Sequence, residues 1–108
     1  MPCNAAHAFE DDIKAATDLP FICIIDATTE ALRRMNPSAR RVGILATTGC
    51  IDAGLYQTAF GRIGIETIVP SGQTRDLFME ALHAIKRGDT GETPKRQMTA
   101  VADAIIAE

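Results

Sequence analysis

Short apolar runs alternate with amphipathic segments along this chain. Three of the runs predict buried strands, at Phe21–Ile25, Val42–Ala46 and Ile65–Val69. Between and after them, apolar residues recur every three or four positions, as they do on one face of a helix. Strands that alternate with helices favour an α/β fold, which we expect to be a three-layer α/β/α arrangement around a mainly parallel sheet.

The helical pattern predicts five helices. The first follows Asn4, whose side-chain oxygen can cap it, and places Phe9, Ile13 and Ala16 on its apolar face. The other four carry their apolar positions within residues 27–35, 51–63, 77–85 and 98–106.

Residues typical of helix ends flank several of these segments. Asp26 or Thr28 can cap the second helix, and Gly64 is expected to end the third. Thr93 is expected to cap the last helix, with Pro94 at its first position.

The composition narrows the class of protein. The chain has 108 residues, enough for one domain, and with 46% hydrophobic but only 5% aromatic residues its core must be mainly aliphatic. A formal net charge of -3 argues against a nucleic acid or an anionic membrane as partner. Three cysteines at scattered positions suit a reducing cytoplasm better than a disulfide framework, and Cys23 is expected in the core. No leader and no membrane-spanning run is evident, so we expect a soluble cytoplasmic protein.

Two turns carry the candidate chemistry. In parallel sheets, ligands bind where the carboxyl ends of strands meet the following helices, and residues 1–4 and 47–50 are predicted to form such turns. Cys3 precedes a predicted helix, a position that favours the thiolate and points to a reactive cysteine. His7, inside that helix, is expected to be structural and bonded to the backbone. Phosphate binding at residues 47–49 is disfavoured, because a phosphate-binding loop has more glycines and a following lysine.

Three stretches resemble one known family. Residues 3–7, Cys-Asn-Ala-Ala-His, closely resemble the Cys-Asn-Thr-Ala-His signature of the aspartate/glutamate racemases. Residues 43–50, Gly-Ile-Leu-Ala-Thr-Thr-Gly-Cys, with Gly54-Leu55-Tyr56 after them, are similar to that family's second signature, Leu-Leu-Ala-Thr-x-Gly-Thr followed by Gly-x-Tyr. Residues 85–88 are similar to a third segment, whose lysine faces the substrate. The aspartate racemase branch is the most similar.

This resemblance implies a fold and a reaction. The family has two pseudo-symmetric lobes with a cleft between them, often forms dimers, and uses neither pyridoxal phosphate nor a metal. Two cysteines face the α-carbon of an amino acid from opposite sides, one removing the α-proton and the other returning a proton. Such a site must neutralise the substrate carboxylate and exclude water.

Matching positions assign roles to single residues. Cys3 would be one catalytic cysteine. The substrate-binding positions would be Asn4, Ala5, Thr47, Thr48, Cys50 and Lys86, with Lys86 near a side-chain carboxylate.

The chain also departs from the family pattern. Ala5 and Cys50 stand where the family has threonines, and the second catalytic cysteine, normally in a Gly-Cys-Thr-Glu strand end, is absent. We therefore expect a central segment, with residues 1–18 ending the first lobe and residues 19–108 forming most of the second. Cys50 is a further, less favoured candidate for the missing base.

Other functions are compatible with the same residues. Hydantoin racemases and maleate isomerases share the two-cysteine architecture, although their signatures match less well. The alternative from another class is a catalytically incomplete remnant that binds a small carboxylate or a partner chain. The activation of Cys3 would distinguish these possibilities.

Overall fold

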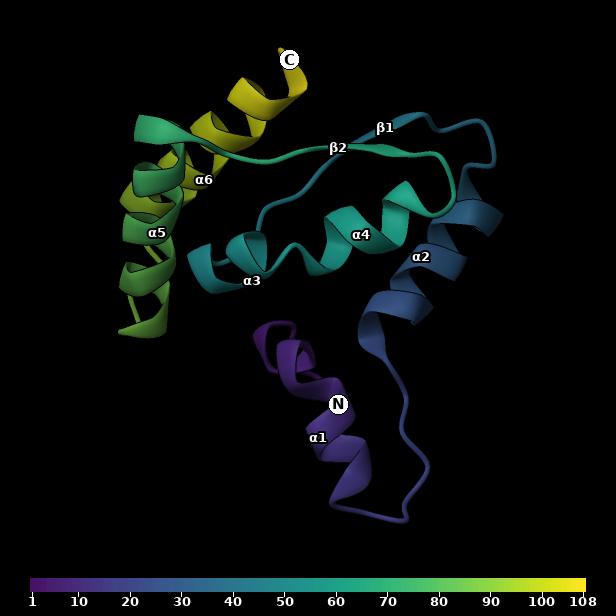
Figure 1. Ribbon diagram of the computed structural model, residues 1–108. Coiled ribbons are helices and arrows are strands. Elements are labelled where there is room, and N and C mark those ends of the chain that lie inside the picture. Colours follow the sequence, from purple (N-terminus) through teal and green to yellow (C-terminus); the bar gives the residue numbers. More distant parts are fainter. The chain divides into compact units, whose positions relative to one another are not determined.

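The computed structural model describes all 108 residues (Figure 1). The chain divides into two compact units. The first consists of Met1–Val42 and Gly49–Thr67, and the second of Gly43–Thr48 and Ile68–Glu108. No helix in the chain combines the length and the apolar character needed to cross a membrane.

The two strands are short and parallel. β1 (Arg41–Gly43) and β2 (Glu66–Ile68) form a two-stranded sheet. The N–H of Glu66 donates to the carbonyl of Arg40, and that of Ile44 to the carbonyl of Ile68, both at 2.9 Å. The residue numbers of the paired groups increase in the same direction along both strands, so the strands are parallel. The strands predicted at 42–46 and 65–69 are thus confirmed with shorter bounds, and the protein is a mixed α/β protein with a parallel sheet.

Helices form most of the first unit. They are the 3-10 helix η1 (Ala5–Phe9), α1 (Glu10–Ala15), α2 (Ile24–Met35) and α4 (Leu55–Gly61), with α3 (Thr48–Ala53) beginning one residue before this unit's second segment. Helices α2 and α4 pack against each other. The buried side chains of this unit are mainly aliphatic and aromatic: Ile25, Cys50, Ile51, Tyr56, Ala59, Phe60 and Ile65.

The predicted strand at Phe21–Ile25 is wrong. Residues 21–23 form neither strand nor helix, and Ile24 and Ile25 open α2. The N–H of Ile24 donates to His7 Nε2 at 3.2 Å instead of joining a sheet. A short apolar run cannot by itself distinguish a strand from the start of a helix, and here a contact 17 residues away decides the outcome.

The expected cap of α2 and the expected burial of Cys23 also need correction. Cys23 occupies the N-cap position without a side-chain cap and is only half-buried. The hydroxyl of Thr28 donates back to the carbonyl of Ile24 at 2.7 Å, so Thr28 lies inside the helix and not at its start.

The helix predicted over residues 51–63 is broken. Gly54 lies between α3 and α4 with φ 67°, a left-handed conformation that glycine adopts at low cost. Gly64, with φ 75°, follows the end of α4 as expected, and the N–H of Ile65 reaches back to the carbonyl of Phe60 at 3.0 Å.

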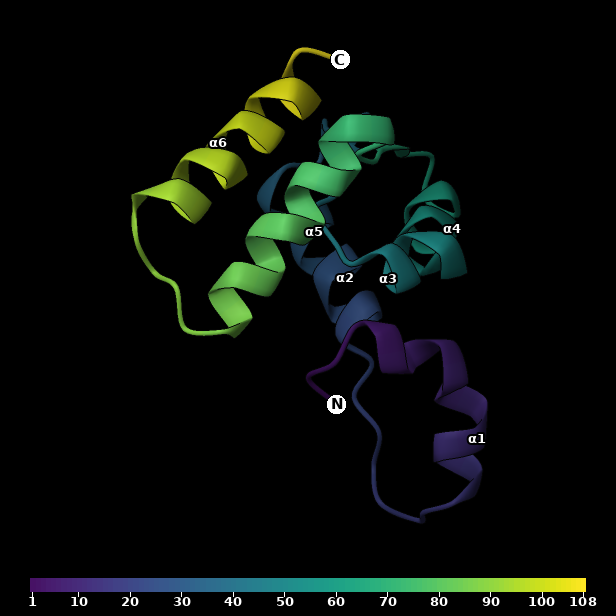
Figure 2. The same cartoon turned by 90° about the vertical axis from the view of Figure 1, so that its left-hand side faces the viewer.

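The second unit is built on a helical hairpin. Helices α5 (Gly72–Lys86) and α6 (Glu92–Ile106) pack side by side (Figures 1 and 2). Their buried residues are Phe78, Ala81, Pro94, Val101 and Ile105. Two expectations fail at α6: Gly91 and not Thr93 is its N-cap, and Ile106 is 81% exposed instead of facing inward.

Candidate functional site

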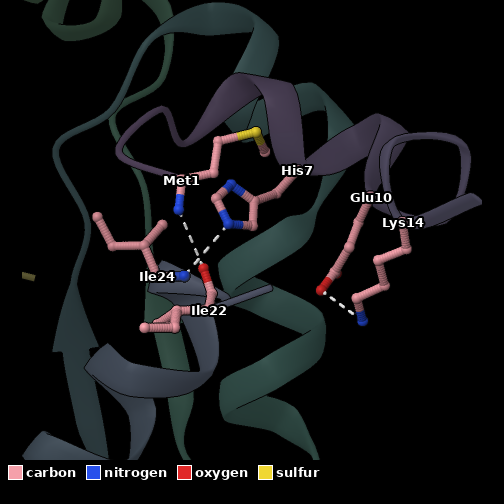
Figure 3. A network of polar contacts seen from close by, with 6 residues as sticks. All are labelled: Met1, His7, Glu10, Lys14, Ile22 and Ile24. Carbon is pink, nitrogen blue, oxygen red and sulfur yellow. Dashed lines mark hydrogen bonds and ion pairs between the residues drawn. The ribbon is translucent and has the colours of Figure 1, made fainter. Parts of the chain in front are cut away.

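The backbone around Cys3 is anchored by a buried histidine. Cys3 is exposed and lies just before η1. His7 is only 3% exposed, and its Nδ1 lies 2.7 Å from the carbonyl oxygen of Cys3, while its Nε2 receives the N–H of Ile24 (Figure 3). A carbonyl can only accept and an amide N–H can only donate, so His7 is neutral with its proton on Nδ1. The structural role expected for His7 is confirmed.

A second contact ties the same loop to the residues before α2. The ammonium group of Met1 donates to the carbonyl of Ile22 at 3.2 Å (Figure 3). The ring of Phe21 meets the His7 ring edge-on, with 5.8 Å between centroids. His7 Nε2 also satisfies one of the N–H groups that a helix start leaves without an intrahelical partner. The loop that carries Cys3 is therefore held from the N-terminal end of α2.

Asn4 does not cap the first helix. Its own backbone is already helical (φ -58°, ψ -50°), and its side chain makes no capping bond. Instead, Asn4 Oδ1 accepts a hydrogen bond from the hydroxyl of Tyr56 at 2.8 Å. Tyr56 is a site residue that the sequence reasoning missed, although the Gly54-Leu55-Tyr56 spacing in the second signature contained the signal.

Ala5 and Cys50 belong to the same unit as Cys3. Ala5 is exposed at the start of η1, whereas Cys50 is 2% exposed in the first turn of α3. Burial raises the pKa of the Cys50 thiol, and the negative charge of Cys3 adds to this rise. Cys50 therefore holds its proton more firmly than an ordinary cysteine.

Thr47, Thr48 and Lys86 lie in the second unit. Thr48 begins α3, and its carbonyl accepts a hydrogen bond from Arg75 Nη2 at 3.2 Å. Both threonines are half-buried, and Lys86 is exposed at the end of α5. Arg75, on α5, is a second residue that sequence reasoning missed, because no motif marked it.

Charged side chains elsewhere in the chain form surface ion pairs or lie near the ends of helices. Lys14 Nζ lies 3.0 Å from Glu10 Oε1, and this pairing, aided by a hydrogen bond from Cys23, lowers the pKa of the Glu10 carboxyl.

A groove of about 600 Å³ is lined by Arg33, Arg40 and Arg62, together with Asn36, Pro37, Ala39, Ile63 and Ile65. It lies where α2 and α4 end, so positive side chains there complement the exposed carbonyl ends of two helices. No group of three or more His, Cys, Asp or Glu side chains is arranged to hold a metal ion.

Comparisons with known proteins define the family. The family model described as Asp/Glu/Hydantoin racemase matches residues 1–108, so the chain belongs to this family. It is 28% identical over 68 residues to the broad specificity amino-acid racemase RacX of Bacillus subtilis. It is 34% identical over 79 residues to a Pectobacterium carotovorum protein known as the uncharacterized protein in the pnlA 3' region. The structure of Picrophilus torridus aspartate racemase has the same fold over the whole chain, with a TM-score of 0.84 and 24% identity.

The chain is shorter than these relatives. The matches span 73% of this chain and 51% of the Pectobacterium protein, and 63% of this chain and 29% of RacX. The structural match includes 100% of this chain and 43% of the Picrophilus racemase. The chain thus spans at most about half the length of the relatives it matches.

Proposed function

We propose that this chain contributes one half of the active site of an amino-acid racemase, with aspartate as the first substrate to test. The observation that carries the proposal is the family match over all 108 residues, which includes an exposed Cys3 on a loop that buried His7 anchors. The similarity to RacX and to an aspartate racemase supports an amino acid as substrate.

In the proposed reaction, the Cys3 thiolate removes the α-proton of the bound amino acid. The electron pair stays on the α-carbon until a second thiol delivers a proton to the opposite face, which inverts the centre. Neither pyridoxal phosphate nor a metal takes part. Hydrogen-bond donors at Asn4, Thr47 and Thr48 hold the carboxylate, and Lys86 attracts the side-chain carboxylate of aspartate. Positions 5 and 50 line the same substrate.

The second thiol is proposed to come from chain beyond these residues, in the lobe of which residues 19–108 form most. Residues 1–18, which carry Cys3, are proposed to end the other lobe. The working enzyme is proposed to be a cytoplasmic homodimer that needs no nucleic acid or membrane. Two observations support these proposals. One is the resemblance to the racemase family, and the other is that the chain spans at most about half of its relatives' length.

The same length difference supports a second candidate. A chain that holds one catalytic thiol would bind a small carboxylate, or a partner chain, without completing racemisation. The two candidates differ in what happens at the substrate α-carbon, so one experiment separates them.

L-aspartate and D-aspartate are incubated separately with the chain in deuterated water, and both α-proton loss and chirality are followed. A complete two-base site exchanges both enantiomers and interconverts them. A half-site exchanges one enantiomer with retention, and Cys3→Ser abolishes this exchange. If neither enantiomer exchanges and aspartate does not slow alkylation of Cys3, the racemase proposal fails for this chain.

A further inference from the structure

The amide of Asn4 accepts a hydrogen bond from a tyrosine of another element. Tyr56 lies in α4, is 9% exposed, and donates its hydroxyl hydrogen to Asn4 Oδ1 at 2.8 Å. The Tyr56 ring stacks on Phe60, one turn further along the same helix, with 5.8 Å between centroids and 30° between planes. Packing therefore restricts the position of the Tyr56 ring independently of its hydrogen bond to Asn4.

This contact uses only one side of the amide. A primary amide has one acceptor oxygen and two N–H donors. The oxygen of Asn4 is engaged by Tyr56, and its Nδ2 makes no hydrogen bond within the protein. In this structure the phenol hydroxyl is the donor and Oδ1 is the acceptor, so Oδ1 faces Tyr56 and Nδ2 lies on the other side of the amide. The two N–H groups of this exposed residue are thus directed away from Tyr56 and remain available to a ligand.

We infer that Tyr56 is a positioning residue, which fixes the Asn4 amide so that it presents donors, and not its oxygen, to the substrate. This inference rests on the proposed function, in which Asn4 contacts the substrate. An amide turned this way favours a carboxylate, which only accepts hydrogen bonds, over a neutral amide group at the same place. Tyr56 acts through Asn4 and does not itself touch the substrate.

Selective labelling offers a direct observation of this amide. The chain has two asparagines, Asn4 and Asn36, so side-chain ¹⁵N-asparagine labelling gives two NH₂ signal pairs. Asn36 is an internal control, because its Oδ1 also accepts a hydroxyl, that of Ser38 at 3.1 Å. Asn4→Ala assigns the pairs by removing one of them.

Tyr56→Phe keeps the ring and removes the donor. We expect it to shift the Asn4 pair and leave the Asn36 pair in place, which also shows that the fold is kept. Titration with malonate or L-aspartate should shift the Asn4 pair, with affinity about three- to tenfold weaker in Tyr56→Phe, the effect of losing one hydrogen bond. Malonamide, the neutral counterpart of malonate, should shift it far less.

Three further variants sharpen the test. Ser38→Ala should move the Asn36 pair without changing malonate affinity. Asn4→Asp keeps the acceptor for Tyr56 but lacks the donors, so it should lose malonate binding even though the phenol contact persists. In the Asn4→Ala background, Tyr56→Phe should have no further effect on affinity, because coupled residues are not additive.

The outcomes separate this inference from the proposed function. If Tyr56→Phe leaves the Asn4 pair unchanged, or weakens malonate equally with and without Asn4, the positioning role is overturned. If Tyr56→Phe shifts the pair but no carboxylate does so in the parent chain, the orientation is established and the proposed substrate contact is overturned.

Discussion

His7 contacts two backbone groups through two ring nitrogens, and substitutions can separate the two contacts. His7→Asn keeps a donor near the position of Nδ1, which faces the Cys3 carbonyl, whereas His7→Gln places an acceptor near the position of Nε2, which faces the Ile24 N–H. Each variant leaves one part-buried backbone group without its partner, so each should lose about 0.5–1.5 kcal/mol of unfolding free energy in urea, the contribution of one hydrogen bond.

Only one of these variants should alter the reactive loop. We expect His7→Gln to change the alkylation rate of Cys3, measured by peptide mass mapping, and His7→Asn to keep it near that of the parent chain. Cys50, which is buried, is the slow reference thiol in the same sample. Equal alkylation rates in the two variants would mean that His7 supports the fold without positioning Cys3.

Cys50 should make stability depend on alkaline pH. Its thiol pKa is raised in the folded protein, by burial first and by the charge of Cys3 second. The folded state therefore retains a proton that the unfolded chain releases near its ordinary thiol pKa of about 8.5. Stability from this group is complete below that pH and falls as pH rises through the folded value.

The measurement is urea unfolding between pH about 8 and about 10, which brackets the ordinary thiol pKa. The decline should be smaller in Cys50→Ala than in the parent chain, although the variant starts from a lower stability. Cys23→Ala, which leaves Cys50 in place, should keep the parent slope. The same slope in all three proteins would contradict the assignment to Cys50.

Among the elements, the break between α3 and α4 depends on one glycine. Gly54 has φ 67°, so a side chain there would be strained, and Gly54→Ala should cost about 1–2 kcal/mol in urea unfolding. Gly61, inside α4, has no positive φ, and a Cβ placed there would meet no atom within 4 Å. Gly61→Ala should therefore stabilise by about 0.4–1 kcal/mol. A stabilising Gly54→Ala would show that one continuous helix is preferred.

The elements also show how far the sequence predicts the fold. The runs that become β1 and β2 were recognisable because each is apolar, short and followed by a helical pattern. The run at Phe21–Ile25 has the same appearance, yet the contact between His7 and Ile24 directs it into a helix start. The break at Gly54 was missed because the apolar spacing continues across it, and a lone glycine is compatible with either outcome.

For the candidate site, the residues in local motifs were predictable from the sequence, whereas the contacts between distant residues were not. Motif resemblance singled out Cys3 and Asn4 from local spacing, and the expectation of a structural His7 was confirmed. The contact between Tyr56 and Asn4 joins residues 52 positions apart, and Arg75 reaches Thr48 across 27 positions. Such contacts depend on packing, and local sequence periodicity does not contain them.

At the scale of the molecule, several large apolar side chains face solvent. In the first unit, Leu19 is 76%, Ile22 73% and Met35 85% exposed. The two-stranded sheet adds strand edges with unpaired backbone groups, which are prone to pair with another chain. The matched segments span at most about half the length of each of these relatives, so a partner chain or further residues of the same chain are the candidates to cover these surfaces.

We therefore predict that the isolated chain self-associates as its concentration rises. Burial of apolar surface stabilises by roughly 25 cal/mol per Å², so removing such side chains should weaken association measurably. Sedimentation velocity over a range of concentrations should show dimers or larger species, and the double variant Leu19→Lys/Ile22→Lys should shift the distribution toward monomer. Ile106→Lys, at an equally exposed apolar position in the second unit, is the matched control. An equal effect of both variants would indicate non-specific aggregation, and a parent chain that stays monomeric at every concentration would contradict the prediction.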